Sequence, residues 1–333
     1  MSAVLKEVRH IPEEPSTPPV IVVGTGPVGI HFVEQLLRRQ PDTAVVIFGD
    51  EPWEPYNRVR LTGLLTGECK LSALQNPIKL GATHNVIQQF NCKIVSIDCT
   101  RRLVTDHLGH SREYSKLVLA TGSTPHVPNI DGVDHAGIYT FRSLGDAEKL
   151  VARRARSRRA IVLGGGLLGL EAARGLQKYN TDVTIVEHAA RLMSQQLDDP
   201  AAALLREHLM SSGLRVVLGD SVKRVIGDGR IKGVELRSGR RIACDTMVIS
   251  TGTRPNLRLA LDAGISVGRG IRVNDRMQTS DENVFAVGEC AEHRDRIYGL
   301  VAPGLEQAGV AAHCILGGDS HYTGSMAAMR LKA

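Results

Sequence analysis

Two glycine-rich stretches with the same spacing limit most strongly the folds that this chain can adopt. Residues 21–30 read IVVGTGPVGI and residues 161–170 read IVLGGGLLGL, so both contain the spacing G-x-G-x-x-G. In each, an apolar run typical of a buried strand leads into the glycines, and a helical pattern follows. Such glycines allow the backbone to approach a pyrophosphate, which then lies at the positive end of the helix. The chain is therefore predicted to contain two nucleotide-binding α/β units.

Each unit continues with a second strand that ends at acidic residues. The first is expected over Ala44–Phe48, followed by Asp50 and Glu51, and the second over Thr181–Val186, closed by Glu187. A carboxylate about 20 residues beyond such glycines is where a ribose hydroxyl is held. A single glycine motif is weak support, whereas two motifs with strand, helix and terminal acid make coincidence a poor explanation.

Composition bounds the remaining possibilities. The 333 residues predict two or three domains, and 42% hydrophobic with 23% charged residues is ordinary for a globular protein. The formal net charge is +6, and aromatic residues make up 4%, which disfavours a nucleic-acid stacking surface. The N-terminus lacks the apolar segment of a secretory signal. The six cysteines lack C-x-x-C spacing and the histidines lack ligand spacing, so no metal site is predicted. Scattered cysteines also suit a reducing environment, which predicts a cytoplasmic location.

Three further segments are predicted as strands that end in small residues. They are LVLATGS (117–123), MVISTGTRPN (247–256) and DENVFAVGECAE (281–292). Glycines at such strand ends allow close approach of a ligand. Two sites imply two nucleotides, and a flavin paired with a nicotinamide forms an electron relay.

Taken in order, GTGPVG, ATGSTP, GGGLLGLEAA, STGTRPN and NVFAVGECAE resemble the FAD-dependent pyridine nucleotide oxidoreductases. The resemblance implies an α/β fold with two Rossmann-like, three-layer domains, the NAD domain being inserted into a split FAD domain. The implied division is a flexible leader over 1–18, a FAD-binding domain over 19–145 plus 265–318, and an NAD(P)H-binding domain over 146–264. Residues 319–333 resemble only the start of a C-terminal interface domain. Oligomeric state is left open.

Within the family, the chain is most similar to the FAD/NAD(P)H-binding part of the NAD(P)H nitrite reductase large subunit, and next to rubredoxin and ferredoxin reductases. YNRVRLT (56–62) resembles their flavin-side loop, but Gly63 stands where ferredoxin reductases usually have Lys. SQQLD (194–198) also resembles the nitrite reductase branch. That subunit continues into iron–sulfur and sirohaem modules that are absent from this sequence. A fragment and a naturally short protein both fit.

The motifs and the resemblance together imply two sets of site residues. The set expected at FAD is Gly24, Gly26, Pro27, Gly29, Asp50, Glu51, Arg58, Arg60, Ile94, Ala120, Thr121, Gly122, Gly288 and Glu289. The set expected at NAD is Gly164, Gly166, Leu167, Leu168, Gly169, Glu171, Glu187, Thr251 and Gly252. No catalytic protein residue is required, because the flavin carries the chemistry.

Several of these residues have alternatives. Arg58 and Arg60 are expected near the flavin ring or phosphates, or else are surface charge. Glu171 resembles the carboxylate near the nicotinamide in relatives, or else caps a helix or forms a salt bridge. Cys290 is expected to be a small buried residue rather than a redox centre. The arginines of RRARSRR (153–159) predict a solvated helix face or a docking patch for an acidic carrier.

The expected nucleotide is NADH rather than NADPH. Glu187 would accept hydrogen bonds from the ribose hydroxyls and repel a 2′-phosphate, whereas His188 and Arg191 could offset that repulsion. The expected function is therefore hydride transfer from NADH to FAD, followed by electron transfer to a haem or iron–sulfur centre, a rubredoxin or a ferredoxin. The alternative is a flavin-binding NADH sensor or scaffold with slow turnover.

Overall fold

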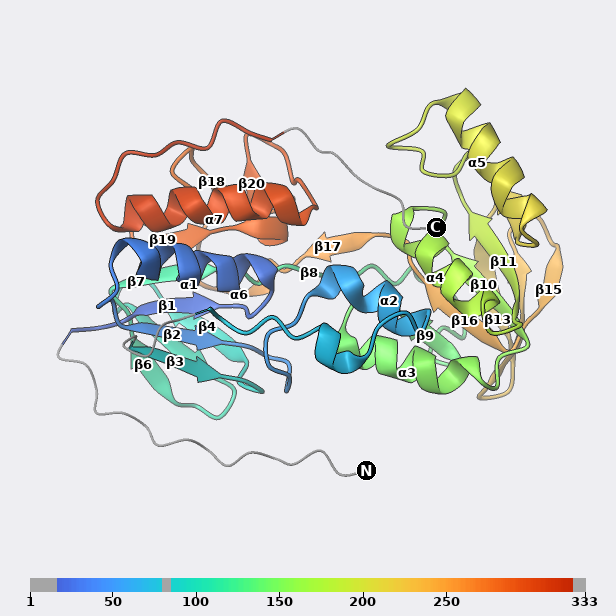
Figure 1. Ribbon diagram of the computed structural model, residues 1–333, viewed down its shortest axis with the longest axis horizontal. Helices are drawn as coiled ribbons and strands as arrows, with labels where there is room; N and C mark the ends of the chain where they lie inside the picture. The colour runs from blue at the N-terminus through green and yellow to red at the C-terminus, as the bar shows by residue number, and fades with distance from the viewer. Residues whose placement is uncertain (1–16, 80–84, 326–333) are drawn as a thin grey trace.

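The computed structural model describes residues 17–79 and 85–325, which form two α/β lobes lying side by side (Figure 1). Of the predicted leader, only residues 17 and 18 are described, and residues 326–333 of the predicted C-terminal segment also lie outside the described part. Each lobe is built on a five-stranded sheet with parallel pairing. The predicted α/β class is confirmed.

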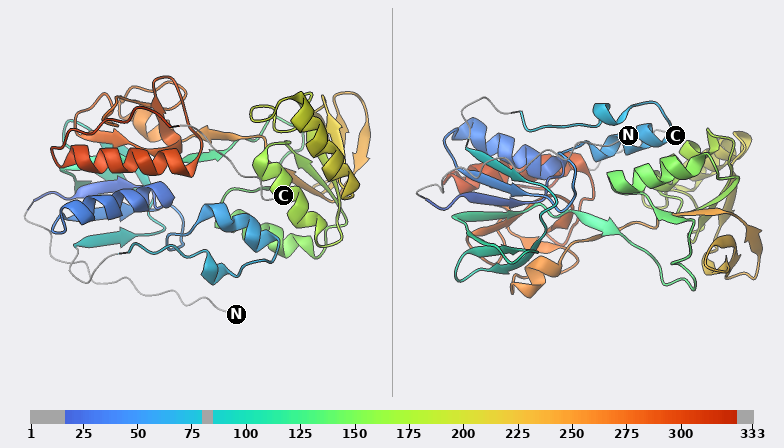
Figure 2. Two further views of the ribbon diagram at one scale, coloured as in Figure 1. Left: turned by 45° about the horizontal axis from the view of Figure 1, so that its top comes forward. Right: turned by 90° about the horizontal axis from the view of Figure 1, so that it is seen from below.

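The first lobe takes strands from both ends of the described chain. In spatial order they are β19 (Val284–Ala286), β7 (Lys116–Leu119), β1 (Val20–Val23), β2 (Val45–Phe48) and β3 (Val86–Gln89). The central strands are continuous apolar runs because both faces of the sheet are covered. Helices α1 (Pro27–Arg39) and α7 (Val301–Ile315) lie together on one face. On the other lies an antiparallel sheet of β4 (Ile94–Asp98), β5 (Leu103–Asp106) and β6 (Ser111–Glu113) (Figure 2).

Smaller elements complete this lobe. They are α6 (Arg258–Asp262), β18 (Ile271–Val273), the short 3₁₀ helix η3 (Gly288–Cys290) and β20 (Ala291–His293). Ala260, Ile265 and Ile271 join the hydrophobic core of this lobe. The chain therefore re-enters the first lobe at α6, ahead of the expected position 265.

The second lobe repeats the design with residues from the middle of the chain. Its strands, in spatial order, are β12 (Arg215–Leu218), β11 (Asp182–Glu187), β10 (Arg159–Leu163), β16 (Thr246–Ile249) and β9 (Ile138–Thr140). Helices α3 (Leu144–Arg154) and α4 (Leu167–Gln177) pack on one face. A meander of β13 (Val222–Gly227), β14 (Ile231–Leu236) and β15 (Arg241–Ala243) covers the other. Helix α5 (Asp199–Ser211) lies beside β12.

The expected boundary between residues 145 and 146 falls inside α3, and β9, which precedes it, pairs in parallel with β16. Two antiparallel strands, β8 (Ser123–Pro125) and β17 (Thr253–Pro255), cross between the lobes. The second sheet thus begins earlier in the chain than the motifs alone indicated, because β9 carries no glycine signature.

A segment that follows β2 leaves the first sheet and packs against the second lobe. It holds η1 (Arg58–Arg60), α2 (Leu61–Leu65) and η2 (Leu71–Ala73). Its buried side chains share one core with α3 and α4; they are Tyr56, Leu61, Leu65 and Leu74. This segment connects the environment of the first glycine loop to the second lobe.

Candidate functional site

The outer glycines of both loops are required by the fold itself. Gly24 has φ +124°, and a Cβ there would lie 2.1 Å from the carbonyl oxygen of Ala120. A Cβ on Gly29 would lie 2.1 Å from the carbonyl oxygen of Gly24. In the second loop, Gly164 (φ +115°) and Gly169 are confined in the same way, within 2.3 and 2.1 Å of backbone oxygens. These positions serve the close packing of strand, loop and helix.

The middle glycines face open space instead. A Cβ on Gly26 would meet only Nε of Arg58, at 4.0 Å, and a Cβ on Gly166 would meet nothing within 4 Å. Each is the residue before its helix, α1 or α4, and neither helix start is capped by a side chain. Backbone N–H groups at these starts therefore remain available to an anion, which fits the pyrophosphate of a dinucleotide.

One cavity of about 2340 Å³ runs past both helix starts. Its walls include these residues of the expected FAD set: Gly24, Gly26, Pro27, Asp50, Glu51, Arg58, Ile94, Ala120, Thr121, Gly122, Gly288 and Glu289. They also include these residues of the expected NAD set: Gly164, Gly166, Leu167, Leu168, Glu171, Glu187, Thr251 and Gly252. The cavity thus brings both sets together.

Three expected residues are not on the cavity wall. Gly29 and Gly169 lie behind their loops, where they pack against backbone. Arg60 is exposed and donates a hydrogen bond to the carbonyl of Ala73 at 2.9 Å. For Arg60, the surface alternative agrees with its position.

In the first lobe, the acid beyond β2 is held by side chains. Glu51 accepts a hydrogen bond from the Tyr56 hydroxyl at 2.6 Å and forms an ion pair with Arg58. The Arg58 guanidinium also lies 5.0 Å from the centre of the Tyr56 ring. Burial raises the pKa of Tyr56, so the phenol keeps the proton that it donates. Asp50, the other acid expected here, is exposed at the cavity edge.

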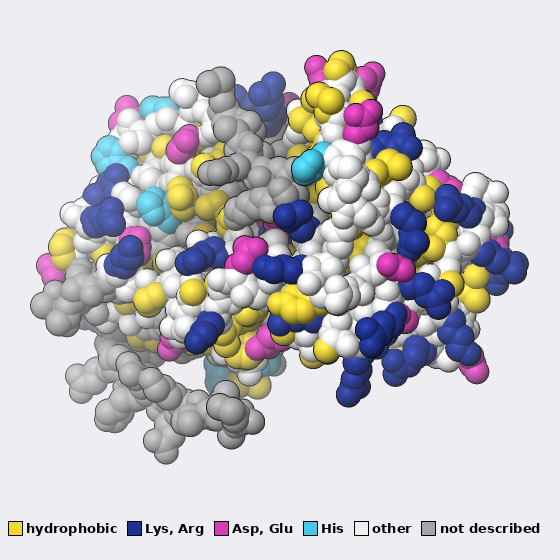
Figure 3. Space-filling view, turned by 45° about the vertical axis from the view of Figure 1, so that its right-hand side comes forward, with side chains coloured by type: hydrophobic (Ala, Val, Ile, Leu, Met, Phe, Trp, Pro, Cys, Tyr) yellow, Lys and Arg dark blue, Asp and Glu magenta, His cyan; other side chains and the backbone are white. Residues whose placement is uncertain are grey.

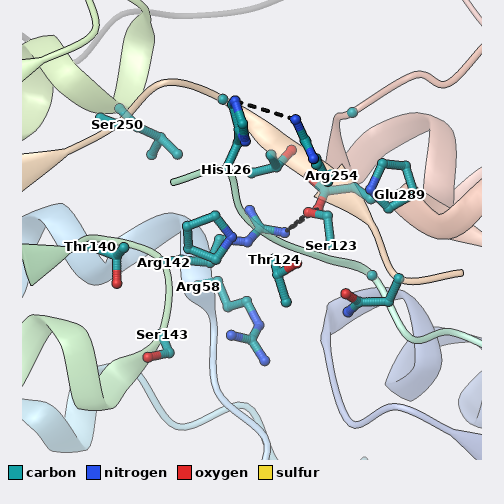
Figure 4. A pocket seen from close by; sticks show the side chains of 18 of the residues that line it. Arg58, Ser123, Thr124, His126, Thr140, Arg142, Ser143, Ser250, Arg254 and Glu289 are labelled. Atoms are coloured by element: carbon teal, nitrogen blue, oxygen red, sulfur yellow. Dashed lines mark hydrogen bonds and ion pairs between the residues drawn. The ribbon is translucent and has the colours of Figure 1, made fainter. Parts of the chain in front are cut away.

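Three polar side chains, Ser123, Arg142 and Glu289, form a cluster at the junction of the lobes. Glu289 accepts a hydrogen bond from Ser123 Oγ at 2.6 Å and forms an ion pair with Arg142. Arg142 also donates to Ser123 Oγ at 2.9 Å, and Figure 4 shows the three side chains converging. Of the three, only Glu289 is predicted from the sequence, since no motif marks Arg142, which lies 147 positions away. The arginine compensates the charge of a carboxylate in the cavity wall.

Glu171 connects the second lobe to the segment that follows β2. Only 4% of the residue is exposed, and its carboxylate accepts a hydrogen bond from Thr62 Oγ1 at 2.5 Å. Within the described residues, Glu171 forms no ion pair and caps no helix. The expected alternatives of a salt bridge or a cap are therefore not what the structure shows, and the carboxylate lies on the cavity wall between the lobes.

Glu187 is held mainly by backbone amides. It accepts hydrogen bonds from the N–H groups of Gly165 at 2.5 Å and Ala189 at 2.8 Å. His188, which is exposed, places Nδ1 2.7 Å from the same carboxylate. Arg191 is paired with Asp199 at 2.8 Å and also donates to two carbonyls in its own loop. Its guanidinium is thus engaged away from Glu187.

The arginine run before β10 divides into structural and exposed members. Arg153 binds Thr246 Oγ1 and the carboxylate of Asp245, and Arg154 donates to the Leu65 carbonyl at 2.7 Å. Arg154 also lies 3.9 Å from the centre of the Tyr179 ring. The solvated-face interpretation is therefore wrong for these two. Exposed members of the run are Arg156, Arg158 and Arg159, on a lobe where Lys and Arg cover much of the surface in Figure 3.

Cys290 is completely buried behind the loop that carries Glu289. Its Sγ lies 3.3 Å from the carbonyl oxygens of both Leu119 and Val287, the acceptors within reach of its single S–H, and burial raises its pKa. A neutral thiol agrees with the expected packing role. Among residues 17–79 and 85–325, no group of three or more His, Cys, Asp or Glu residues could hold a metal ion. No helix in the same described part is long and apolar enough to cross a membrane.

Comparison with known proteins decides the family. The model of the family described as "Pyridine nucleotide-disulphide oxidoreductase" matches residues 18–313. The chain belongs to this family. Its members use FAD and NAD(P)H, so the expected cofactor pair is confirmed at the level of the family.

Two relatives and one solved structure show which members of the family this chain resembles. The assimilatory nitrate reductase electron transfer subunit and the nitrite reductase [NAD(P)H] of Bacillus subtilis are each 38% identical over 316 residues, or 94% of this chain. The matched part is 41% and 39% of those proteins, so the chain spans about two-fifths of their length. A ferredoxin reductase from Rhodopseudomonas palustris superimposes with a TM-score of 0.87 at 26% identity, covering 92% of this chain and 78% of that one. The predicted family and its reductase branch are confirmed.

Proposed function

We propose that the cavity holds FAD along the first glycine loop and NADH along the second, and that this chain passes electrons from NADH to a protein acceptor. The observation that carries the proposal is the single cavity with both loops in its wall. Two separate cavities would bind two nucleotides without bringing them into contact. A shared cavity allows the reacting ends to meet where the lobes meet.

The first lobe supplies the residues that would hold FAD. The open helix start at Gly26 would bind the pyrophosphate, and Glu51 or Asp50 would accept the ribose hydroxyls. Arg58 and the Arg142–Glu289 pair form polar walls toward the lobe junction. When bound, the flavin supplies the conversion of a two-electron donor into single electrons.

The second lobe would orient the nicotinamide nucleotide. Gly166 and the start of α4 would bind its pyrophosphate, and Glu187 its adenosine ribose. Glu171 would accept a hydrogen bond from the nicotinamide carboxamide, since its carboxylate is fixed by Thr62, lines the cavity and forms no ion pair among the described residues. No side chain is needed as nucleophile or general base, which agrees with the buried, hydrogen-bonded state of Cys290.

The proposed acceptor is a protein with a haem or iron–sulfur centre, a rubredoxin or a ferredoxin. Support comes from the names of relatives, which include an electron transfer subunit and a ferredoxin reductase. The cytoplasm remains the proposed compartment, because six scattered cysteines suit a reducing environment. The competing function, an NADH sensor with slow turnover, is less well supported, since both middle glycines are retained and face open space.

Anaerobic stopped-flow reduction of the FAD-bound chain tests the proposal. NADH should bleach the flavin faster than about 1 per second, within the usual range of enzyme turnover, and ferricyanide should reoxidise it over many cycles. Dithionite serves as the control, because it reduces flavin without using a nucleotide site. A flavin that dithionite bleaches quickly and NADH only slowly would favour the sensor instead.

A further inference from the structure

The adenosine end of the proposed NADH site carries an arginine, Arg237, that belongs to none of the sequence motifs. Arg237 lies in the turn between β14 and β15, is exposed, and lines the same cavity as Glu187 and His188. Among the described residues, its guanidinium has no hydrogen bond or ion pair. A free arginine on the wall of a nucleotide site indicates a ligand group that it could bind.

The turn is tied to the strand end that carries Glu187. The N–H of Asp220 donates to the carbonyl of Glu187 at 3.2 Å. The Asp220 carboxylate accepts from the N–H of Ser221 at 2.8 Å and from the hydroxyl of Ser238 at 2.5 Å. The N–H of Arg237 in turn donates to the Ser221 carbonyl at 2.9 Å. Asp220 thus holds the hairpin turn against the edge of the parallel sheet where the ribose is expected.

The other basic side chains at this end are already engaged. Arg191 is bound by Asp199, and His188 is paired with Glu187 itself. The Glu187 carboxylate has both oxygens occupied by the chain, one by the Gly165 amide and one by the Ala189 amide and His188. Part of its charge is therefore offset before any nucleotide binds, which weakens the repulsion of a phosphate.

We propose that Arg237 is a specificity-determining residue that binds the 2′-phosphate of NADPH, so that the site admits NADPH more readily than Glu187 alone would allow. The inference depends on the proposed role of the second loop as a pyridine nucleotide site. A guanidinium forms paired, charge-assisted hydrogen bonds to phosphate oxygens. NADH and NADPH differ only in that phosphate, so its partner acts on one nucleotide and not on the other.

Binding of the two adenosine halves tests this without any redox reaction. ADP-ribose and 2′-phospho-ADP-ribose are titrated calorimetrically into the full chain and into Arg237→Gln. The variant should weaken 2′-phospho-ADP-ribose about tenfold, the size of one charge-assisted contact, and should change ADP-ribose less than about twofold. Arg237→Lys should retain part of the difference, since it keeps the charge.

Arg240→Gln is the matched control, because it removes the same charge from the same hairpin at an exposed position outside the cavity wall. It should leave both affinities unchanged. Equal weakening of both ligands by Arg237→Gln would mean that Arg237 stacks on the adenine, and would overturn the proposal. Unchanged affinities in Arg237→Gln would also overturn it, as would an equal loss of 2′-phospho-ADP-ribose affinity in Arg240→Gln. A wild-type chain that binds neither ligand would instead overturn the proposed nucleotide site.

Discussion

The strands that follow the two glycine loops end differently. Gly49 and Glu187 occupy equivalent places, since each follows the strand residue that pairs with the residue before the first loop glycine. In the first unit Thr25 fills the space between loop and strand end, and a Cβ on Gly49 would lie 2.5 Å from its Oγ1. In the second unit Gly165 leaves that space open, and Glu187 fills it. The larger residue is thus on the loop in the first unit and at the strand end in the second.

This exchange determines where each unit can keep its carboxylate. Glu187 stands directly at its strand end and is held by amides of its own loop. In the first unit the equivalent place is blocked, so the acid lies further along, at Glu51, and side chains hold it. One of these, Tyr56, also accepts a hydrogen bond from the N–H of Leu144 at the start of α3. The first site is therefore tied to the second lobe, whereas the carboxylate of the second depends on its own loop.

The largest effect should come from the first glycine of a loop, whose backbone conformation is similar in the two units. Gly24→Ala would bring a Cβ within 2.1 Å of the Ala120 carbonyl oxygen at φ +124°, where L-residues are strained. We expect a loss of stability above about 3 kcal/mol, or no folded protein. Gly26→Ala, two positions along and open on its Cβ side, should unfold near the wild-type midpoint in urea. Equal midpoints for both variants would contradict the division between fold glycines and ligand glycines.

Substitution of each middle glycine should affect one nucleotide site and leave the other intact. Gly26→Val should give a folded but colourless protein, because the side chain projects to where the FAD pyrophosphate is proposed to bind. Gly166→Val should stay yellow and lose reduction by NADH, while dithionite still bleaches its flavin. Visible absorbance and stopped-flow traces measure both. Full flavin content in Gly26→Val would show that the first loop is not the FAD site.

These contrasts also show what the sequence could and could not predict. The strands and glycine loops follow from local patterns, since an apolar run and a tight turn depend on neighbours in the chain. Thr62 and Glu171 lie 109 positions apart, and their contact depends on how the segment after β2 packs on the second lobe. Arg154 resembles its solvated neighbours in sequence, yet it binds the Leu65 carbonyl for the same reason. Long-range contacts between lobes carry no local signal.

The last prediction concerns nucleotide choice, where the second unit differs most from the first. Two like charges about 4 Å apart near a protein surface repel by up to about 4 kcal/mol, which salt and relaxation reduce. A net preference of about 1.5–3 kcal/mol for NADH over NADPH, or about 10- to 150-fold, is expected from Glu187. Glu187→Ala should weaken NADH use and narrow or reverse the ratio of kcat/KM values. It should also lower stability by about 1–3 kcal/mol, because the buried Gly165 amide and the part-buried Ala189 amide lose their acceptor.

Asp182→Ala provides the control for charge, since Asp182 is exposed at the opposite end of the same strand. It removes one carboxylate from β11 but should leave the nucleotide ratio unchanged, because it lies away from the cavity wall. The ratio is to be measured with one acceptor at two salt concentrations. Repulsion between the Glu187 carboxylate and the 2′-phosphate should weaken as salt rises, so Glu187→Ala should change the nucleotide ratio less at high salt than at low salt. A wild type that prefers NADPH would contradict the expected net preference, and a ratio that Glu187→Ala leaves intact would show that this carboxylate does not select the nucleotide.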